Sequence, residues 1–366
     1  MKFIFDKNIL FKEISIAQEI IASKNAISIL SNIYFEAKNN SLIIKSTDMK
    51  VYFETTVPVT VIESGATTVF GDKFLGIISS FPSNEIEFSQ KDNNIKIKPT
   101  KLKTPEYNLK CIASEKFPEF PVTTNEFFDF PIKDFKEMVQ QCVFAVSDDE
   151  TRYFMNGVFF EKNEEKIKMV ATDGRRLAFI SKNSDKKVKD FDGIIIPPKL
   201  LNIIVKRSGE EGLISISVND RMLFANIGSY KFSSILIEGS FPNYKKVIPD
   251  EQQFTLTVKR EEMLKALHRV AHMVEQKSYR VYLGILPGKM SVYTEEGEIG
   301  KANDEIPCKY DGDELTIALN YRYIEEPLKN INSEDISIHF TGVTKAITVE
   351  PVPSKDFFHI VMPMQI

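Results

Sequence analysis

The sequence contains a threefold internal repeat, which limits the fold more than any other feature of its 366 residues. The string LSNIYFE at 30–36 matches MNGVFFE at 155–161, an offset of 125 residues counted from 30 to 155. Thr47-Asp48 and Thr172-Asp173 are related by the same offset. Because independent segments share one offset, the sequence indicates repeated structural units.

A predicted helix in the first two copies follows nearly the same repeat. Its apolar residues occur at positions i, i+1, i+3 and i+4, a spacing that places them on one face of a helix. At an offset of 126 residues the matched positions are Phe74, Leu75, Ile77 and Ile78 in the first copy and Leu200, Leu201, Ile203 and Ile204 in the second.

A third copy is fainter and begins with FTLTVKREEMLKAL at 254–267. This string resembles FFDFPIKDFKEMV in the second copy and FIFDKNILFKEI in the first, each a short strand that leads into an amphipathic helix. We align Phe11 with Phe135 and Met263 in these helices.

The three copies also end in similar strings, which are FPEFP at 117–121, FPNYKKVIP at 241–249 and FFHIVMP at 357–363. These strings place boundaries near 124 and 251. The predicted domains are therefore residues 1–124, 125–251 and 252–366.

Each copy reads as a strand, a helix, several alternating strands, a second helix and further strands. This order predicts an α+β fold with helices on one face of antiparallel sheets. Asp173-Gly174 and Asp311-Gly312 predict the turns of β-hairpins. Pro327 falls inside the last copy's second helix, where proline removes an amide donor, so we expect a kink or a late start there.

The composition excludes several classes of protein. With 43% apolar and 27% charged residues the chain is typical of globular proteins, and no run is long enough to span a membrane. A net charge of −4 argues against a protein that coats nucleic acid with its whole surface, so any DNA-facing basic surface is local. The cysteines, Cys111, Cys142 and Cys308, show neither disulfide nor zinc spacing, and we interpret them as buried thiols of a cytoplasmic protein.

Three successive copies, ATDGRRLA at 171–178, FPNYKKVIP at 241–249 and the terminal IVMPMQI together resemble the bacterial beta sliding clamps, the beta subunits of DNA polymerase III. The resemblance covers Met1 to Ile366. It implies three clamp domains, each with two helices packed on antiparallel β-sheets, that form half of a closed ring. Two copies joined head to tail would encircle double-stranded DNA without reading its sequence.

The resemblance further implies a processivity factor without catalytic activity, cofactor or membrane association. The implied partners, recognised through linear peptide motifs, are the DNA polymerase III alpha subunit, the clamp-loader delta subunit, other polymerases, mismatch-repair proteins and DNA ligase. The residues that match the family's peptide pocket are Met155, Thr172, Gly174, Arg175, Arg176, Leu177, Pro242, Lys246, Val247, Val343, Ala346, Ile360, Val361, Met362, Pro363 and Met364.

Within that pocket we expect an apolar floor of Leu177, Val247, Val361 and Met362, with Arg175 and Arg176 at the lip. An inter-domain core is the plainer interpretation, although methionines so close to a chain end are unusual in a core. The chain departs from its relatives at Arg175, where histidine is common, at Ala346, where serine is frequent, and at the Gln365-Ile366 end.

Basic residues on or beside the helices would face DNA, and the plainer interpretation is a solvated helix face. The predicted DNA-binding residues are Lys24, Lys73, Lys136, Arg152, Tyr153, Lys199, Lys206, Arg207 and Arg269.

A basic strand region in the first copy and an acidic one in the third would form the dimer contact, and solvated edge strands are the alternative. The predicted dimer residues are Lys98, Lys101, Lys103, Tyr107, Leu109, His272, Met273, Glu298, Asp304 and Glu305.

Two other functions compete with a clamp. One is a hydrolase of three β-rich modules, although the four histidines show no metal spacing and no nucleotide-binding or nucleophile motif occurs. The other is a scaffold that does not bind DNA, in which the basic helices face solvent.

Overall fold

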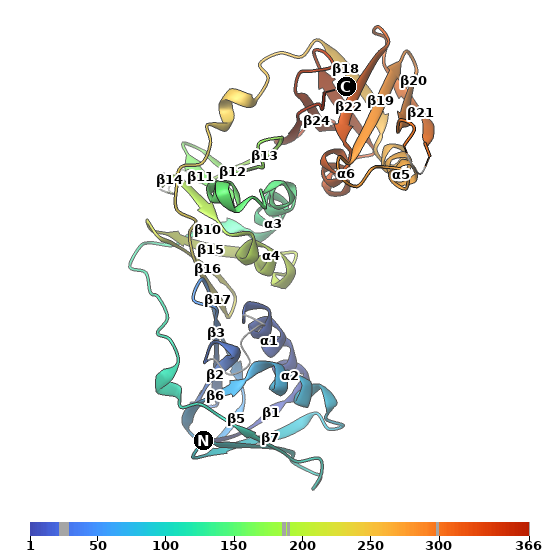
Figure 1. The fold of residues 1–366 in the computed structure, drawn as a ribbon. Helices are drawn as coiled ribbons and strands as arrows, with labels where there is room; N and C mark the ends of the chain where they lie inside the picture. Colours follow the sequence, from blue (N-terminus) through green and yellow to red (C-terminus); the bar gives the residue numbers. More distant parts are fainter. Residues whose placement is uncertain (22–28, 185–187, 189–190, 298–299, 366) are drawn as a thin grey trace. The chain divides into compact units, whose positions relative to one another are not determined.

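The computed structural model describes residues 1–21, 29–184, 188, 191–297 and 300–365. It divides into two compact units (Figure 1). The first unit contains Met1–Lys133 and Lys199–Leu236, and the second contains Asp134–Pro198 and Ile237–Ile366. The central copy of the repeat thus contributes to both units, and our limits at 124 and 251 remain predictions.

Each copy of the repeat supplies two of the α-helices found in the described residues. The first helices of the copies are α1 (Lys7–Ile20), α3 (Ile132–Cys142) and α5 (Arg260–Ala271), and the second helices are α2 (Gly71–Ser80), α4 (Pro198–Arg207) and α6 (Tyr321–Asn330). Short 3-10 helices are η1 (Ile29–Ser31), η2 (Ser114–Lys116), η3 (Val143–Ala145), η4 (Glu150–Met155) and η5 (Tyr244–Val247).

The first unit contains a five-stranded and an eight-stranded antiparallel sheet. The five-stranded sheet has the order β5 (Thr60–Glu63), β1 (Lys2–Asp6), β7 (Glu85–Lys91), β8 (Asn94–Pro99) and β9 (Tyr107–Lys110). The eight-stranded sheet has the order β10 (Phe128–Pro131), β15 (Leu213–Val218), β16 (Met222–Ile227), β17 (Tyr230–Ile235), β4 (Val51–Pro58), β3 (Ser41–Thr47), β2 (Asn32–Lys38) and β6 (Gly65–Phe70). Because β17 pairs with β4, this sheet joins the first two copies.

Phenylalanine rings fill the core of the first unit between its helices and strands. Phe3 and Phe88 stack with ring centroids 4.8 Å apart, and Phe35 meets Phe74 of α2 edge to face at 5.4 Å. Each ring is fully buried, which is worth about 1.5–3 kcal/mol of transfer free energy per side chain. The Asp6 carboxylate caps α1 by accepting from two backbone amides, which explains why the helix starts directly after β1.

The second unit contains a twelve-stranded sheet that joins the second and third copies. Its order is β14 (Phe191–Ile196), β11 (Val158–Asn163), β12 (Lys166–Thr172), β13 (Arg176–Asn183), β25 (Phe357–Val361), β24 (Ile347–Val352), β23 (Asp335–Phe340), β18 (Phe254–Lys259), β21 (Asn303–Lys309), β20 (Lys289–Tyr293), β19 (Arg280–Leu286) and β22 (Leu315–Asn320). The pairing of β13 with β25 joins the copies in the same way as the pairing of β4 with β17.

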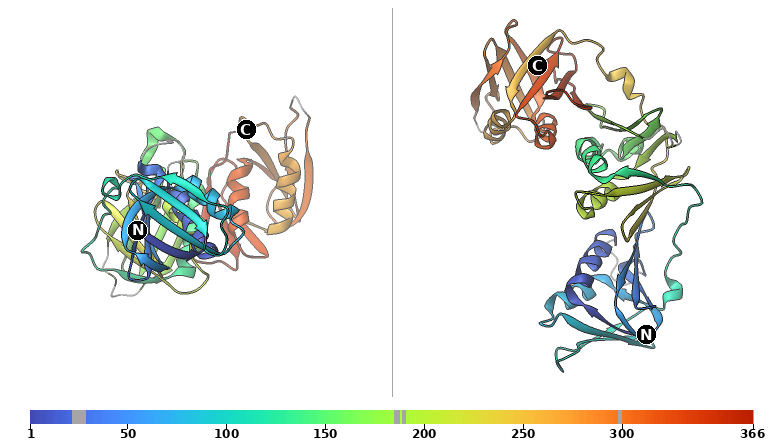
Figure 2. Two further views of the ribbon diagram at one scale, coloured as in Figure 1. Left: turned by 90° about the horizontal axis from the view of Figure 1, so that it is seen from below. Right: turned by 180° about the vertical axis from the view of Figure 1, so that it is seen from behind.

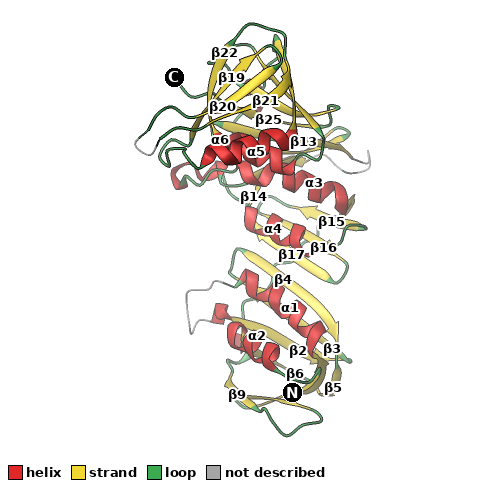
Figure 3. Ribbon diagram, turned by 90° about the vertical axis from the view of Figure 1, so that its right-hand side faces the viewer, coloured by secondary structure: helices red, strands yellow, loops and turns green. Residues whose placement is uncertain are grey.

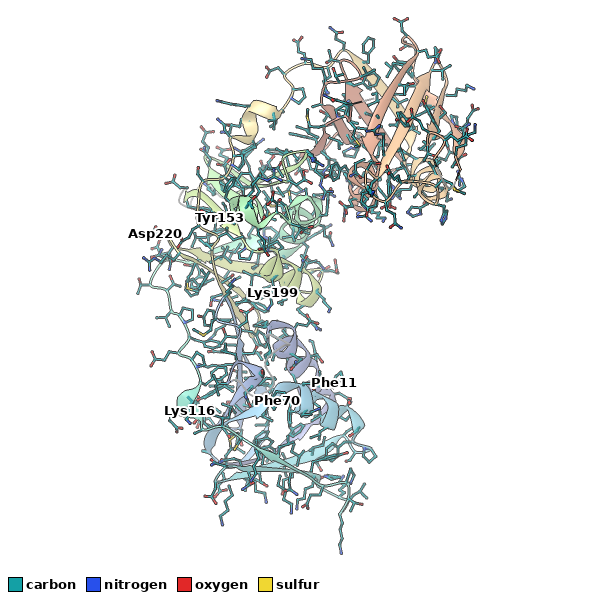
Figure 4. The ribbon with its side chains drawn as sticks, in the orientation of Figure 1. Phe11, Phe70, Lys116, Tyr153, Lys199 and Asp220 are labelled. Atoms are coloured by element: carbon teal, nitrogen blue, oxygen red, sulfur yellow. The ribbon has the colours of Figure 1, made fainter. Side chains whose placement is uncertain are left out.

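Helices cover one face of the sheets within each unit, which confirms the predicted α+β class. Figure 3 shows α1 and α2 in front of the strands of the first unit. The view from behind in Figure 2 shows the connecting segment after β9 on the opposite side of the first unit's strands from these helices. Phe11 and Lys199 accordingly lie on the helical side in Figure 4, whereas Lys116 lies on the other side.

The alignment of the first helices was wrong by one residue. Phe11 is 39% exposed, whereas Phe135 and Met263 are fully buried. The buried equivalent in α1 is Leu10. Adjacent residues on a helix point about 100° apart, so a one-residue error moves a side chain from the core to the surface. Leu10 and Phe135 restore the offset of 125 seen elsewhere in the repeat.

The hairpin predicted at Asp173-Gly174 is confirmed, because β12 and β13 flank it and pair with each other. The hairpin predicted at Asp311-Gly312 is wrong. The strands on either side, β21 and β22, are separated in the sheet by β20 and β19, so this turn begins a crossover. The Asp-Gly dipeptide correctly predicts a turn, but it does not determine which strand pairs with β22, the strand that follows.

The late start expected at Pro327 is also wrong. Helix α6 begins at Tyr321, where the Asn320 side chain accepts from the Arg322 amide, and it continues past the proline to Asn330. Of the cysteines, Cys142 is buried as expected, but Cys111 and Cys308 are only partly buried, and all three are free thiols.

Candidate functional site

The turn between β12 and β13 is held by its own side chains. The Asp173 carboxylate accepts from the Arg175 and Arg176 amides at 2.8 and 3.1 Å, and the Thr172 hydroxyl donates to the Arg176 carbonyl at 2.6 Å. Gly174 adopts a φ of 87°, a conformation that suits glycine. The turn therefore presents the Arg175 side chain to solvent on a fixed backbone.

The same turn occurs between β3 and β4. Asp48 accepts from the Lys50 and Val51 amides at 2.9 and 2.7 Å, and the Thr47 hydroxyl donates to the Val51 carbonyl at 2.9 Å. Met49 takes the position of the glycine with a φ of 71°. A Thr-Asp pair that recurs with these bonds has a structural role.

An apolar cluster of Val170, Leu177, Tyr244 and Ile360 lies beside this turn. Leu177 pairs with Ile360 across β13 and β25, and Tyr244 reaches them from the connecting segment 237–253. Ala346 packs against the same cluster from the loop before β24. The structure thus brings together three predicted pocket residues from separate parts of the sequence, Leu177, Ala346 and Ile360.

The predicted floor of the pocket divides into buried and exposed residues. Val361 is fully buried and Leu177 is 3% exposed, whereas Val247 and Met362 are 53% and 43% exposed. Val343 adds a third exposed apolar side chain in the same unit. Val361 therefore supports the floor from beneath and does not form its surface, which corrects its predicted place.

The segment that follows β25 is tied to the fold by its backbone. The Met362 amide donates to the Arg175 carbonyl at 2.9 Å, and the Met364 amide donates to the Ala318 carbonyl at 2.8 Å. The first bond holds Met362 beside the turn, and the second holds Met364 against β22, although chain ends usually fray.

Arg176 does not lie at a lip, as we had expected. Its side chain is only 11% exposed and donates to Asp173 Oδ2 at 3.1 Å, to the Phe144 carbonyl at 2.6 Å and to Glu326 of α6. Its guanidinium also lies over the Tyr323 ring, 4.6 Å from the centroid. The Arg176 side chain therefore links the turn to the Phe144 carbonyl and to α6. Of the two arginines, Arg175 is the exposed one.

The remaining predicted pocket residues lie in the same unit. Met155 is buried at the end of η4, Pro242 is partly buried, and Lys246 is exposed on η5. Tyr244 was missed by the sequence interpretation. Its hydroxyl donates to Glu161 Oε1 at 2.8 Å, and burial followed by this carboxylate raises the pKa of the phenol.

His359 on β25 is a second residue that the sequence did not single out. Its Nε2 lies 3.1 Å from Gln141 Oε1, and the Gln141 amide donates to the Asn330 carbonyl at 2.7 Å. Burial, followed by the nearby Arg176 charge, lowers the pKa of His359 to about 3. The sequence did contain a signal for this buried histidine, because His359 occupies an inward position of the alternating strand FFHIV.

The basic residues of α4 are paired with acidic partners from the first copy. Lys199 Nζ lies 2.6 Å from Asp48 Oδ2, and Lys206 and Arg207 both contact the Glu19 carboxylate, the lysine at 2.7 Å. Burial alone would raise the pKa of Asp48, but hydrogen bonds from Lys199 and two amides hold it below its usual value. These pairs reduce the net positive charge on the helix.

The other predicted DNA-binding residues lie in differing environments. Lys73 is exposed on α2, and Tyr153 of η4 is 52% exposed beside Arg152, which pairs with Asp149 at 2.9 Å. Lys136 is buried in α3, which contradicts its predicted place on a DNA-facing surface. Lys24 lies outside the described residues.

Arg269, predicted for DNA, donates from Nε to Asp304 Oδ2 at 2.6 Å, although Asp304 was predicted for the dimer contact. The contact therefore places one residue from each of the two predicted surfaces side by side.

The predicted dimer residues of the first copy lie at a sheet edge. β9 ends the five-stranded sheet, and it carries Tyr107 and Leu109, both partly exposed. The Tyr107 ring meets Phe81 with centroids 5.5 Å apart. Lys98 pairs with Glu87 at 3.4 Å, and Lys101 and Lys103 are exposed.

The third copy offers a second sheet edge. Strand β18 pairs with β21 only at Cys308 and Lys309 in the part of the chain that the structure describes. Residues 303–307 therefore have β20 on one side alone. The acidic residues Asp304 and Glu305 lie there, while Met273 is 39% exposed after α5 and His272 is exposed beside it. Glu298 lies outside the described residues.

Three domain models of the DNA polymerase III beta subunit together match nearly all of the chain. The N-terminal domain matches residues 1–121, the central domain 129–243 and the C-terminal domain 245–365. The chain belongs to the beta sliding clamp family. It is therefore a DNA sliding clamp and a non-catalytic processivity subunit of DNA polymerase III, and the hydrolase and scaffold alternatives are excluded.

Individual clamps are similar over the full length of both chains. The beta sliding clamp of Treponema pallidum is 42% identical, with 100% of each chain covered. Among solved structures, the clamp from Bartonella birtlesii bound to griselimycin is 25% identical with a TM-score of 0.94, and the clamp from Pseudomonas aeruginosa bound to griselimycin is 23% identical with a TM-score of 0.93. Both matches cover 100% of each chain and agree with the three-domain clamp fold.

Within the ranges that the structure describes, no helix of this clamp is long and apolar enough to cross a membrane. The same ranges contain no group of three or more His, Cys, Asp or Glu side chains arranged to hold a metal ion.

Proposed function

We propose that this clamp holds its partners by short linear peptides, in a groove over the cluster of Leu177, Tyr244 and Ile360. The observation that carries the proposal is a set of three exposed apolar side chains, Val247, Val343 and Met362, each within three residues of a member of the packed cluster or of a residue that packs against it. Solvent-exposed apolar groups gathered on a rigid base mark an interaction site more often than isolated ones do. Related clamps solved with griselimycin support a ligand-binding role for the family.

The groove suits peptides that present spaced leucine and phenylalanine side chains. Burial of two such side chains contributes about 1.5–3 kcal/mol each before the cost of ordering the peptide, which alone corresponds to a dissociation constant between roughly tens of micromolar and millimolar. Weak binding allows partners to exchange. We infer that the partners include the DNA polymerase III alpha subunit, the clamp-loader delta subunit, other polymerases, mismatch-repair proteins and DNA ligase.

We also propose that two copies close head to tail around double-stranded DNA. The edge strand β9, with Tyr107 and Leu109, would meet the half-open edge at 303–307 and Met273 of the second copy. Lysines beside one edge and carboxylates on the other are complementary in charge. Basic side chains on the helices would contact phosphates without reading bases, as expected for a cytoplasmic replication protein that moves along DNA.

A substitution at Met362 tests the groove. Met362→Asp places a charge among the exposed apolar groups, so the affinity for a fluorescein-labelled leucine and phenylalanine peptide should fall at least about tenfold in fluorescence anisotropy. Leu213→Asp is the matched control, since Leu213 is 56% exposed but lies on β15 in the first unit. Equal affinity in the two variants would refute the groove.

A further inference from the structure

The first unit contains a buried carboxylate where the first two copies of the repeat meet. Helix α1 of the first copy contacts β17 and α4 of the second copy there, and we call this contact the α1 interface. Glu13 of α1 is 6% exposed, and its Oε1 accepts a hydrogen bond from the Tyr230 hydroxyl of β17 at 3.1 Å. Its Oε2 is enclosed and has no hydrogen-bond partner among the described residues. One hydrogen bond therefore serves a buried group that has two acceptor oxygens.

The second unit forms the equivalent interface without a carboxylate. Glu13 and Met138 are each the seventh residue of the first helix of their copy, and Tyr230 and Phe357 each begin the last strand. Met138 and Phe357 are both fully buried. A buried polar pair can often be replaced by apolar residues of similar size without loss of stability. The repeat thus shows that the fold can close this interface with apolar side chains, so packing does not require Glu13.

The cations near Glu13 are engaged elsewhere. Lys12 precedes Glu13 on α1, and its Nζ lies over the Tyr230 ring, 5.8 Å from the centroid. The cations of α4 pair with other carboxylates, Lys199 with Asp48 and both Lys206 and Arg207 with Glu19. Arg207 Nε is enclosed without a partner, as Glu13 Oε2 is. The charge on Glu13 is therefore balanced only by neighbours that form their contacts with other groups.

The strands beneath α1 carry their charges on the opposite side. Lys45, Glu54 and Lys231 are the charged residues of β3, β4 and β17, and Glu54 contacts the two lysines at 3.1 and 2.9 Å. Lys45 also lies over the ring of Phe120, which belongs to the connecting segment on the far side from the helices (Figure 2). These three charges therefore face away from Glu13.

Burial raises the pKa of the Glu13 carboxyl above its usual value, although the hydrogen bond from Tyr230 and the charges of Lys12 and Arg207 act in the opposite direction. A carboxyl whose pKa is higher in the folded than in the unfolded chain stabilises the fold by taking up a proton. This stabilisation is complete below the unfolded value near 4.5 and is lost as the pH rises through the higher folded value.

We propose that Glu13 makes the α1 interface a proton-sensitive contact, which loosens when its carboxylate is charged and tightens when it takes up a proton. The charged form leaves an unpaired oxygen shielded from water, and neutralisation removes most of that cost. The second unit has Met138 at the equivalent place, so its interface lacks this response. The inference does not depend on the peptide groove, which is formed by residues of the second unit.

Calorimetry of the full chain over a range of pH tests the proposal. Glu13→Gln removes the charge, and Glu13→Met copies the residue at the equivalent position of the second unit. Both should raise the melting temperature of the first unit by about 3 °C or more at pH 7.5. The difference from the wild type should shrink by about half or more at pH 5, because the wild-type carboxyl then takes up its proton. Glu211→Gln, an exposed change in the same unit, is the matched control and should shift melting by less than about 1 °C.

Hydrogen exchange locates the effect within the chain. The pairing of β17 with β4 joins the first two copies, and the pairing of β25 with β13 is its equivalent in the second unit. At pH 7.5 the Glu13→Met variant should exchange the amides of β17 about fivefold or more slowly than the wild type. The amides of β25 should exchange at the wild-type rate and serve as the internal control.

Three results would overturn the proton-sensitive contact. The first is a melting temperature in both Glu13 variants no higher than that of the Glu211→Gln control at pH 7.5. The second is a rise of the same size at pH 7.5 and pH 5, which would mean that Glu13 keeps one charge state over that range. The third is equal slowing of exchange in β17 and β25, which would show a general stabilisation in place of a local one.

Discussion

Replacing the largely enclosed Arg176 should destabilise the second unit while leaving the first unit intact. Arg176→Met keeps most of the side-chain volume but removes the donor to Asp173 Oδ2, to the Glu326 carboxylate and to the Phe144 carbonyl. Removing one member of a buried ion pair costs about 3–5 kcal/mol. Because the Glu326 side chain is 34% exposed and partly solvated, we expect about 2–4 kcal/mol here.

Differential scanning calorimetry measures this loss. For a unit of this size the melting temperature should fall by about 5–15 °C, since each kcal/mol shifts it by about 2–4 °C. Arg175→Met is the matched control, because the neighbouring Arg175 side chain is exposed and its change should stay within about 0.5 kcal/mol. The Arg176 variant should also bind groove peptides more weakly. The Arg176 side chain holds the turn in place, and the Arg175 carbonyl of that turn accepts from the Met362 amide.

An Arg176→Met transition that coincides with those of the wild type and the Arg175→Met variant would refute this account. Such a result would mean that water solvates the Asp173 and Glu326 carboxylates in the variant without any loss in the free energy of unfolding. A loss confined to peptide affinity, with unchanged melting, would show instead that Arg176 acts on the ligand directly.

Three further perturbations follow from the structure. Glu19→Gln should release two basic side chains of α4 and steepen the salt dependence of binding to linear duplex DNA by about one unit per phosphate gained, whereas an unchanged slope would place those side chains away from DNA. Leu109→Glu combined with Met273→Glu should give monomers in sedimentation velocity, and a persistent dimer would reject the edge contact. The low pKa of His359 means that the unfolded chain takes up a proton below about pH 6.5 while the folded chain does not, so stability should fall as pH drops from that value toward 3. At pH 5 the loss is about 2 kcal/mol, and calorimetry at pH 7.5 and 5 should show a smaller loss in a His359→Phe variant.

The sequence alone determined the features that depend on neighbouring residues and on periodicity. The Thr-Asp turns at 47–48 and 172–173 are formed by side chains bonding to amides two and three residues ahead, so they are visible in a short string. The amphipathic helices, the alternating strands and their repetition likewise predicted an α+β fold built from three repeated units. The resemblance then pointed to the segments that meet around Leu177 and Ile360.

Only the tertiary structure decided which residues of those segments remain accessible. Arg175 and Arg176 are neighbours with the same charge, yet one is exposed and the other is enclosed by Phe144, Tyr323 and Glu326. Likewise, β22 follows Asp311-Gly312 but pairs with β19, a strand that lies well before it in the sequence. Exposure and strand pairing are set by atoms far away in sequence, whereas turns and helical faces are set within a few residues, and this difference in range separates what could be predicted from what could not.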